Sequence, residues 1–272
     1  MKGIIAEQKA KKSLGQHFLR DEGVLRRICG LLGVEEGDQV MEIGPGPGAL
    51  TALLRPLPWK RLLLIEKDDA YAAAHAAIAL PGMEVVAGDA MEFCWEGLEG
   101  PWKIAGNLPY NVASPLMWDI VQRVPHLERA VFMVQKEVAD RILAAPGSRA
   151  YGALSAWMQS WCAPRRGFTV PPSCFAPPPK VDSAVLSLLP LPGPRPDDPA
   201  ALARLLKICF GQRRKQLQSI LRGPFGAEAS MGALEACGIP PQLRPEALSP
   251  EDFQRLAARL FGDGQAAGGL TA

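Results

Sequence analysis

The sequence predicts an α/β fold, in which a mostly parallel β-sheet carries helices on both faces and a small helical domain follows. Between residues 38 and 135, short apolar runs alternate with segments of helical pattern. The runs are continuous rather than alternating, which is typical of parallel strands buried on both faces. From residue 198 onward the apolar spacing is helical alone. With 272 residues, the chain is long enough for both parts.

Seven strands are expected. Five of them lie at 39–44, 61–68, 83–90, 102–107 and 129–135. Two more, 165–170 and 181–191, are joined by the proline-rich loop PPSCFAPPPK, which restricts the chain to extended, rigid geometry.

Between the strands, helices are expected at 69–80, at 114–124 and near 137–162. In the second of these, Ser114 is suited to cap the helix and Pro115 to occupy its first turn.

A stiff linker separates the two expected domains. The stretch 190–199, PLPGPRPDDP, holds five prolines in ten residues. We therefore expect a larger domain at 1–193, which begins with the basic segment 1–20, and a small helical domain at 194–272 that positions the substrate.

Composition excludes several classes of function. The net charge is only +2, so any binding to nucleic acid must come from local clusters of basic residues. No signal peptide or apolar run of about 20 residues is present, so we expect a cytoplasmic protein without a membrane anchor. The six cysteines lack the spacing of a zinc site, so no metal is expected, and they are interpreted as buried apolar residues. His75 and His126 are expected at the surface.

Unusual residues stand where the predicted parallel strands end. Gly44 and Gly46 follow the first strand, Glu66 ends the second, Asp89 the third and Asn107 the fourth. The carboxyl ends of parallel strands meet at one edge of a sheet, which is where ligands bind in such folds. A carboxylate about 20 residues beyond a glycine-rich turn is typical of a group that holds ribose hydroxyls.

The glycine-rich turn also fits a dinucleotide fingerprint, but two prolines argue against that ligand. A pyrophosphate needs backbone N–H donors at this turn, and Pro45 and Pro47 remove two of them. A nucleoside without phosphates tolerates the loss, and S-adenosylmethionine is such a ligand.

The stretch Asn107-Leu108-Pro109-Tyr110 is suited to chemistry on the exocyclic amine of a base. Such an amine is a poor nucleophile, because its lone pair is delocalised into the ring. The Asn107 side-chain oxygen and the Leu108 carbonyl could accept its two hydrogens and orient the lone pair, while Pro109 stiffens the backbone. Tyr110 offers a flat face for an extruded base, worth about 1–3 kcal/mol of stacking.

These motifs together resemble the ribosomal RNA adenine dimethylases. NLPY resembles the amino-methyltransferase motif and EIGPGPGALT the cofactor motif of that family. KKSLGQHFL (11–19), FMVQKEVADRI (132–142), FAPPPKVDSAV (175–185) and FGQRRKQL (210–217) extend the resemblance over nearly the whole chain. It implies the Rossmann-like fold of class I methyltransferases with a seven-stranded sheet.

The likeness is strongest to the bacterial small-subunit group. It implies that S-adenosylmethionine is used to dimethylate N6 of two adjacent adenosines in a hairpin loop near the 3′ end of 16S rRNA, late in small-subunit assembly. We expect a monomer.

The resemblance also implies roles for single residues. The cofactor would be bound by Gln16, His17, Leu19, Gly44, Gly46, Glu66, Asp89, Ala90 and Asn107. Asn107 and Leu108 would hold the target amine, and Tyr110 and Phe175 would stack on both faces of the target base. Two plainer interpretations stay open: His17 as an exposed loop residue, and Phe175 as a residue that packs the loop against the core.

Basic residues cluster in three places that are interpreted as RNA contacts. These are Lys11, Lys12, Arg165, Arg166, Arg213, Arg214, Lys215 and Arg222. Such contacts would weaken steeply as salt rises.

Three alternative functions remain. A large-subunit rRNA dimethylase shares NLPY, but FAPPPKVDSAV and FGQRRKQL favour the small-subunit group. A DNA adenine methyltransferase is disfavoured, because no added target-recognition segment is present. An RNA-binding assembly factor with a vestigial site is disfavoured by the intact set of residues at the strand ends.

Overall fold

The computed structural model describes residues 17–78, 80–193 and 195–262. Within these residues the chain folds into two compact units. The first takes in the described residues up to Ala139 together with Ala163–Pro190, and the second takes in Asp140–Cys162 together with the described residues from Leu191 onward. The expected boundary at 193/194 lies close to this division, while residues 140–162, expected in the first domain, group with the second unit.

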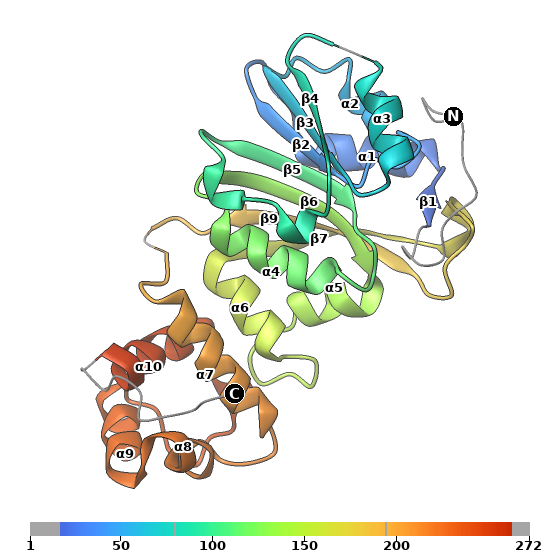
Figure 1. Ribbon diagram of the computed structural model, residues 1–272. Coiled ribbons are helices and arrows are strands. Elements are labelled where there is room, and N and C mark those ends of the chain that lie inside the picture. The colour runs from blue at the N-terminus through green and yellow to red at the C-terminus, as the bar shows by residue number, and fades with distance from the viewer. Residues whose placement is uncertain (1–16, 79, 194, 263–272) are drawn as a thin grey trace. The chain divides into compact units, whose positions relative to one another are not determined.

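The first unit is built on a seven-stranded sheet (Figure 1). Its order is β4 (Met83–Ala87), β3 (Arg61–Glu66), β2 (Gln39–Ile43), β5 (Trp102–Asn107), β6 (Leu127–Gln135), β9 (Ser183–Pro190) and β7 (Cys162–Val170). Strands β2 to β6 pair in parallel, and β9 is antiparallel to β6. The predicted fold class, including the mostly parallel seven-stranded sheet, is confirmed.

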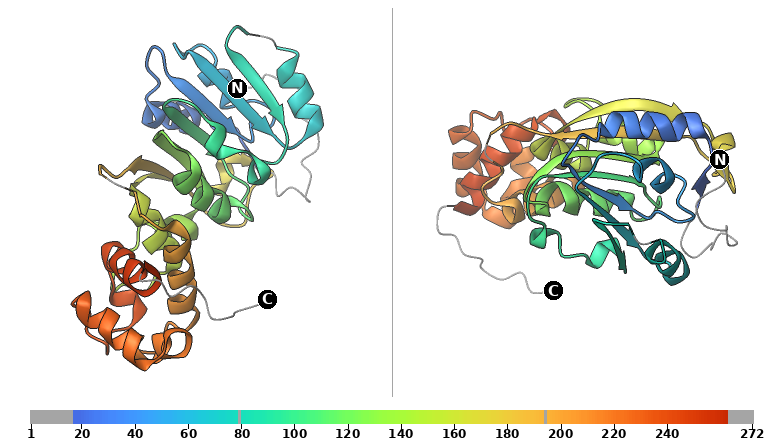
Figure 2. Two further views of the ribbon diagram at one scale, coloured as in Figure 1. Left: turned by 60° about the vertical axis from the view of Figure 1, so that its left-hand side comes forward. Right: turned by 90° about the horizontal axis from the view of Figure 1, so that it is seen from above.

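Helices cover both faces of this sheet. Helix α1 (Glu22–Leu32) lies on one face and α4 (Ala113–Arg123) on the other (Figures 1 and 2). The first unit also contains α2 (Thr51–Leu54) and α3 (Asp69–Ala76), and α5 (Lys136–Ile142) begins directly after β6. Under α1, Leu25, Ile28 and Leu32 join Val40 and Val131 of the sheet in one buried apolar cluster.

A small second sheet ties the start of the described chain to the proline-rich loop. Strand β1 (Phe18–Leu19) pairs antiparallel with β8 (Phe175–Ala176), with Leu19 opposite Phe175. Residues more than 150 positions apart in sequence are thereby held side by side, next to the carboxyl end of β5.

Several local predictions were wrong. Helix α4 begins at Ala113 with Val112 as its N-cap, so Ser114 lies inside the first turn and caps nothing. The helix expected near 137–162 is two helices, α5 and α6 (Ala153–Trp161), separated by the loop 143–152, in which Gly147 has a left-handed φ of 83°.

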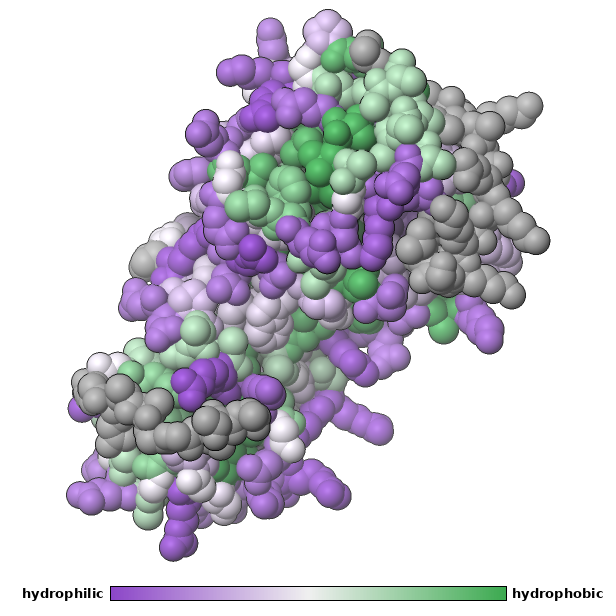
Figure 3. Space-filling model, in the orientation of Figure 1, coloured by the Kyte–Doolittle hydropathy of each residue, from purple (hydrophilic) through white to green (hydrophobic). Residues whose placement is uncertain are grey.

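Burial also differs from two expectations. Cys94 is exposed, and of the cysteines only Cys162 and Cys209 are buried. Strand β4 is not buried on both faces, because it forms an edge of the sheet. Val86 on it is 36% exposed, and apolar surface gathers over β4 and α3 (Figure 3).

Among the described residues of the second unit, the regular secondary structure is helical, apart from the start of β7. It comprises α6, α7 (Pro199–Gly211), α8 (Leu217–Phe225), α9 (Ala227–Ala236) and α10 (Pro250–Gly262). Helix α6 packs against α7 and α10, and the Phe210 ring contacts both Tyr151 and Phe253. None of the helices in the described part of the chain is long and apolar enough to cross a membrane.

Candidate functional site

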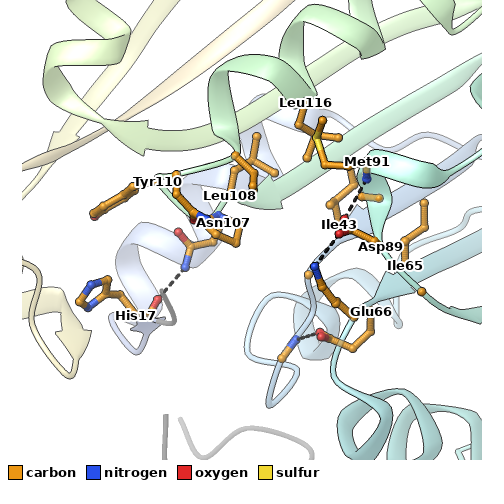
Figure 4. A pocket seen from close by; sticks show the side chains of 18 of the residues that line it. His17, Ile43, Ile65, Glu66, Asp89, Met91, Asn107, Leu108, Tyr110 and Leu116 are labelled. Atoms are coloured by element: carbon orange, nitrogen blue, oxygen red, sulfur yellow. Dashed lines mark hydrogen bonds and ion pairs between the residues drawn. The ribbon is translucent and has the colours of Figure 1, made fainter. Parts of the chain in front are cut away.

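A cavity that is open to solvent lies at the carboxyl ends of the parallel strands (Figure 4). Most of the residues predicted for the site line it: His17, Gly44, Gly46, Glu66, Asp89, Ala90, Asn107, Leu108, Pro109 and Tyr110. Leu19 lines a smaller neighbouring cavity together with Gly44 and Asn107. Strand ends that are far apart in sequence therefore meet in one place, as the sheet topology requires.

The glycine-rich turn shapes one wall of the cavity. Gly44 and Gly46 have φ values of +67° and +52°, which side chains disfavour. A Cβ on Gly46 would lie 3.2 Å from the Phe18 ring, whereas Gly44 has open space around it. The chain can therefore turn sharply here and bring its backbone close to a ligand.

Glu66 is fixed against this turn by backbone donors. Its Oε2 accepts the N–H of Gly46 at 2.8 Å, and its Oε1 accepts the N–H of Asp68 at 2.8 Å. Burial raises the pKa of Glu66, while the two backbone hydrogen bonds act in the opposite direction. Each carboxylate oxygen has a second lone pair, so Glu66 could still accept hydroxyl groups from the cavity.

Asp89, just beyond the end of the adjacent strand β4, provides a second carboxylate to the cavity. Its Oδ2 lies 2.5 Å from Nζ of Lys67, and its Oδ1 accepts the N–H of Met91 at 2.9 Å. The hydrogen bond from Lys67 holds the pKa of Asp89 below its usual range. An ionised carboxylate accepts hydrogen bonds only, so this end of the cavity is suited to a donor such as an amino group.

The Asn107 amide has a fixed orientation. Its Nδ2 donates to the backbone carbonyl of His17 at 2.8 Å (Figure 4). A carbonyl oxygen can only accept, so the atom that faces His17 must be the NH₂ group. The Oδ1 atom is consequently turned away from His17 and is available as an acceptor.

Tyr110 is held at both ends. Its hydroxyl lies 2.6 Å from Oγ of Ser183, which is fully buried on β9. Its ring stacks against His17, with the ring centroids 5.7 Å apart and the planes 26° from parallel. Sequence reasoning missed Ser183, although the residue lies in the FAPPPKVDSAV stretch.

The ring that faces Tyr110 in the structure is that of His17. Phe175 is only 5% exposed and belongs to the buried apolar cluster with Leu19 and Leu25. The plainer interpretation of Phe175, that it packs the loop against the core, describes its place in the structure. His17 is half-buried rather than exposed, and its Nδ1 lies 2.8 Å from the carbonyl oxygen of Pro177.

His75 was expected at the surface, and that was wrong. The side chain is fully buried on α3, with Nε2 2.8 Å from the carbonyl oxygen of Gly46. The available signal was the spacing of Tyr71 and His75, four residues apart on one helix face. The surrounding alanines weakened that signal, because they give the helix little contrast between its faces.

The basic residues differ in their surroundings. Arg165 and Arg166 on β7 are exposed, as are Arg214, Lys215 and Arg222 in the second unit. Arg213 is half-buried there, with Nη2 2.6 Å from the carbonyl oxygen of Arg149 and Nε 3.6 Å from Glu246. Lys11, Lys12 and Gln16 lie outside the described residues. Within the described residues, no three His, Cys, Asp or Glu side chains form a group that could hold a metal ion.

A family model described as "Ribosomal RNA adenine dimethylase" matches residues 7–260. The chain belongs to this family. Among the relatives of this dimethylase, a Nitratidesulfovibrio vulgaris protein named "Ribosomal RNA small subunit methyltransferase A" is 54% identical, over 90% of this chain and 94% of the relative. A protein of the same name from Lawsonia intracellularis is 48% identical, over 93% and 94%.

Solved structures agree with the family assignment. A dimethyladenosine transferase from Plasmodium falciparum is 27% identical, with a TM-score of 0.77, and the match covers 88% of this chain and 96% of the other. The 23S rRNA methyltransferase ErmE is 26% identical, with a TM-score of 0.65, over 89% and 99%. This dimethylase is a methyltransferase with the class I fold, and its methyl donor is S-adenosylmethionine.

The cavity fits that donor. Glu66 could accept the ribose hydroxyls, and Asp89 could accept the amine of the cofactor's adenine. Ile65, Met91 and Leu116 line the cavity with apolar surface on which an adenine ring could pack. A Cβ added to Gly44 would meet no atom within 4 Å, so this turn leaves room for the methionine portion near Asn107.

Proposed function

We propose that the protein dimethylates N6 of two adjacent adenosines in the hairpin loop near the 3′ end of 16S rRNA. The observation that carries this proposal is the oriented Asn107 amide, which presents Oδ1 beside the Tyr110 ring in a cavity suited to S-adenosylmethionine. The names of the bacterial relatives favour the small ribosomal subunit over the large one.

Bound S-adenosylmethionine supplies an electrophilic methyl group. The chain's own residues would prepare the amine that receives it. Asn107 Oδ1 and the Leu108 carbonyl accept its two N–H groups, so that its lone pair points toward the donor. Both acceptors are neutral amides, so the proton lost after transfer passes to solvent rather than to either of them.

Backbone contacts hold these acceptors in place. The Leu108 N–H donates to the Met133 carbonyl at 3.1 Å, and the Leu108 side chain is buried. Pro109 fixes the φ angle directly after Leu108, which limits the directions in which the Leu108 carbonyl can point. Tyr110, braced by Ser183, would carry the extruded adenine on its face. Phe175 is packed in the apolar cluster, so it could stack on the other face only if its ring left that position.

Exposed basic residues would contact the rRNA phosphates. Arg165, Arg166, Arg214, Lys215 and Arg222 are suited to this role because they are exposed, and Arg213 less so, because it is half-buried against Arg149 and Glu246. We further propose that the enzyme works as a monomer in the cytoplasm, on a small-subunit assembly intermediate.

The test is transfer of labelled methyl groups to subunits from cells that lack the enzyme, followed by mapping of the modified bases. We expect label on two adjacent adenosines near the 3′ end of 16S rRNA. Label on the large subunit would instead favour the alternative dimethylase, and binding without transfer would favour an assembly factor with a vestigial site.

The variant Asn107→Ala tests the role of the amide within that assay. We expect transfer to fall by at least about 100-fold, because an oriented acceptor is lost from the reacting centre. Binding of the small subunit and thermal stability serve as controls and should persist. Unchanged methylation by this variant would refute the proposed role of Asn107.

A further inference from the structure

The peptide groups of Gly46 are held from both sides. The Gly46 N–H donates to Glu66 Oε2 at 2.8 Å, and the Gly46 carbonyl oxygen lies 2.8 Å from Nε2 of His75. Glu66 comes from the end of β3 and His75 from the buried face of α3. Gly46 and Glu66 line the cofactor cavity, whereas His75 lies behind the turn.

The protonation of His75 follows from its partner. The Gly46 carbonyl can only accept, so Nε2 of His75 must carry the hydrogen. Nδ1 is buried and has no hydrogen-bond partner among the described residues. Burial lowers the pKa of His75; the hydrogen bond to Gly46 opposes this shift, and the positive charge of Arg55 adds to it, so that the net direction is downward. The side chain is therefore a neutral imidazole with one hydrogen, and that hydrogen is used on Gly46.

The turn itself has few other restraints. Pro45 and Pro47 have no N–H, so neither can anchor it through a backbone hydrogen bond. The Gly44 N–H donates to Ile65 and the Gly48 N–H to Pro45, which leaves the Gly46 carbonyl to be held by His75. An unpartnered carbonyl in this buried position would be unfavourable, and the turn could relieve it by rotating.

We propose that His75 is a positioning residue for S-adenosylmethionine. By holding the Gly46 carbonyl, it restrains rotation at Gly46 and thereby the preceding peptide group, whose N–H holds the Glu66 carboxylate at the angle needed for the ribose hydroxyls. Without the imidazole N–H, the turn and the carboxylate shift together, and the cofactor binds more weakly. His75 touches neither the cofactor nor the RNA.

The competing explanation is that His75 only fills space under the turn. Two variants of similar bulk separate the two roles. His75→Gln keeps a side-chain N–H that can reach the Gly46 carbonyl, whereas His75→Leu removes the donor. His126→Leu is the matched control, because His126 is exposed in the loop after α4. For each variant we would measure the Kd of S-adenosylmethionine by calorimetry, the unfolding temperature without cofactor, and kcat at saturating cofactor.

We expect His75→Leu to raise the Kd by about 10-fold, with a smaller change in kcat, and His75→Gln to restore the Kd to within about 3-fold of the wild type. His126→Leu should leave the Kd unchanged. Equal Kd values for Leu, Gln and wild type, with only the unfolding temperature lowered, would overturn the proposal, as would equal weakening by Leu and Gln.

A measurement on the unaltered protein covers the case in which His75→Leu does not fold. In ¹⁵N-histidine NMR spectra, His75 should be the neutral form with hydrogen on Nε2, and its resonance should shift when the demethylated cofactor S-adenosylhomocysteine is added. Hydrogen on Nδ1, or a resonance that does not respond to the cofactor, would contradict the proposal.

Discussion

The Tyr110 ring is positioned by a residue that the motif does not contain. Its hydroxyl is paired with Ser183, and Ser183 lies on β9, which is separated from β5 in the sheet by β6, rather than on the loop after β5. A base that stacks on Tyr110 depends on the angle of the ring, so the hydroxyl contact matters even though the hydroxyl does not touch the base.

Removing this contact should weaken RNA methylation without removing the stacking face. We expect Tyr110→Phe and Ser183→Ala each to lower kcat/KM for the RNA about 5- to 10-fold, the equivalent of one hydrogen bond of roughly 1 kcal/mol. The double variant should be little worse than either single one, because both remove the same contact. Multiplicative losses in kcat/KM would contradict the pairing. Cofactor affinity is the control and should not change.

The buried carboxyl group of Glu42 should make the stability of the protein depend on pH. It is fully buried and accepts a hydrogen bond from Thr51 Oγ1 at 2.7 Å. Burial raises its pKa from 4.5 to about 8, opposed by the Thr51 hydrogen bond and assisted by the charge of Glu66. The folded protein therefore keeps a proton that the unfolded chain loses above about pH 4.5. Its contribution to the free energy of unfolding falls as pH rises from about 4.5 to about 8.

The variant Glu42→Gln should remove this dependence, because it keeps an acceptor for Thr51 but cannot ionise. Relative to wild type, we expect its free energy of unfolding to rise by a few kcal/mol, about 4 at most, between pH 5 and pH 9. Urea titrations at several pH values, without cofactor, measure this difference. Glu36→Gln, at an exposed position, is the control and should show no such trend. A constant difference across the pH range would refute a buried neutral Glu42.

At the scale of elements, two cations from the sheet hold the end of α1. Lys103 Nζ, on β5, donates to the Gly33 carbonyl at 2.8 Å and lies 2.7 Å from Asp38 and 3.2 Å from Glu128. Arg129 Nη1, on β6, donates to the Leu31 carbonyl at 3.0 Å. The last carbonyl groups of a helix have no hydrogen-bond partner within the helix. These two cations donate hydrogen bonds to such carbonyls, and their positive charge is favourable beside the negative end of the helix dipole of α1.

Loss of Lys103 should therefore destabilise the first unit. In Lys103→Met, the apolar stem is kept, but Asp38 and the Gly33 carbonyl lose a partner. We expect the free energy of unfolding to fall by about 2–3 kcal/mol. This is less than the loss of about 3–5 kcal/mol that follows when one partner of a fully buried ion pair is removed, because Glu128 is partly exposed. Denaturant titration measures this, and Lys180→Met at an exposed position should have little effect. A loss equal to that of Lys180→Met would show that the cation is dispensable.

The strands were predictable because burial on both faces leaves a direct mark on the sequence. For β5, the expected range 102–107 is the observed one. Helix limits were less predictable: Ser114 has the side chain of an N-cap, yet the N-cap of α4 is Val112, two residues earlier, just after the NLPY loop. The loop 143–152 likewise divides a segment whose apolar spacing is helical.

Contacts between residues far apart in the sequence could not be predicted from the local sequence pattern. Asn107 bonds to His17, 90 residues away, and His75 to Gly46, 29 residues away. Sequence motifs were sufficient to predict the residues that line the cavity. Ser183 and His75 lie behind those residues, and their contacts with Tyr110 and Gly46 join segments that come together only when the chain has folded.

For the whole molecule, the proposed RNA contacts predict how affinity responds to salt. Arg214 and Lys215 are exposed, and Lys215 Nζ donates only to the exposed side chain of Gln212 among the contacts described, at 3.0 Å. The neighbouring Arg213 is half-buried and contacts Arg149 and Glu246 within the second unit. The double variant Arg214→Ala/Lys215→Ala should weaken binding of small-subunit particles. It should also reduce the slope of log Kd against log salt by about 1.4–1.8, because fewer counterions are released on binding when two phosphate contacts are lost.

Arg213→Ala should behave differently, because its guanidinium is used on protein groups. We expect it to lower the unfolding temperature of the second unit while changing the salt slope by less than the double variant does. Filter binding of undermethylated particles between about 50 and 200 mM salt, together with calorimetric unfolding, separates the two effects. A salt slope that falls with Arg213→Ala and stays unchanged in the double variant would reverse the assignment, and would mean that Arg213 leaves Glu246 to bind RNA.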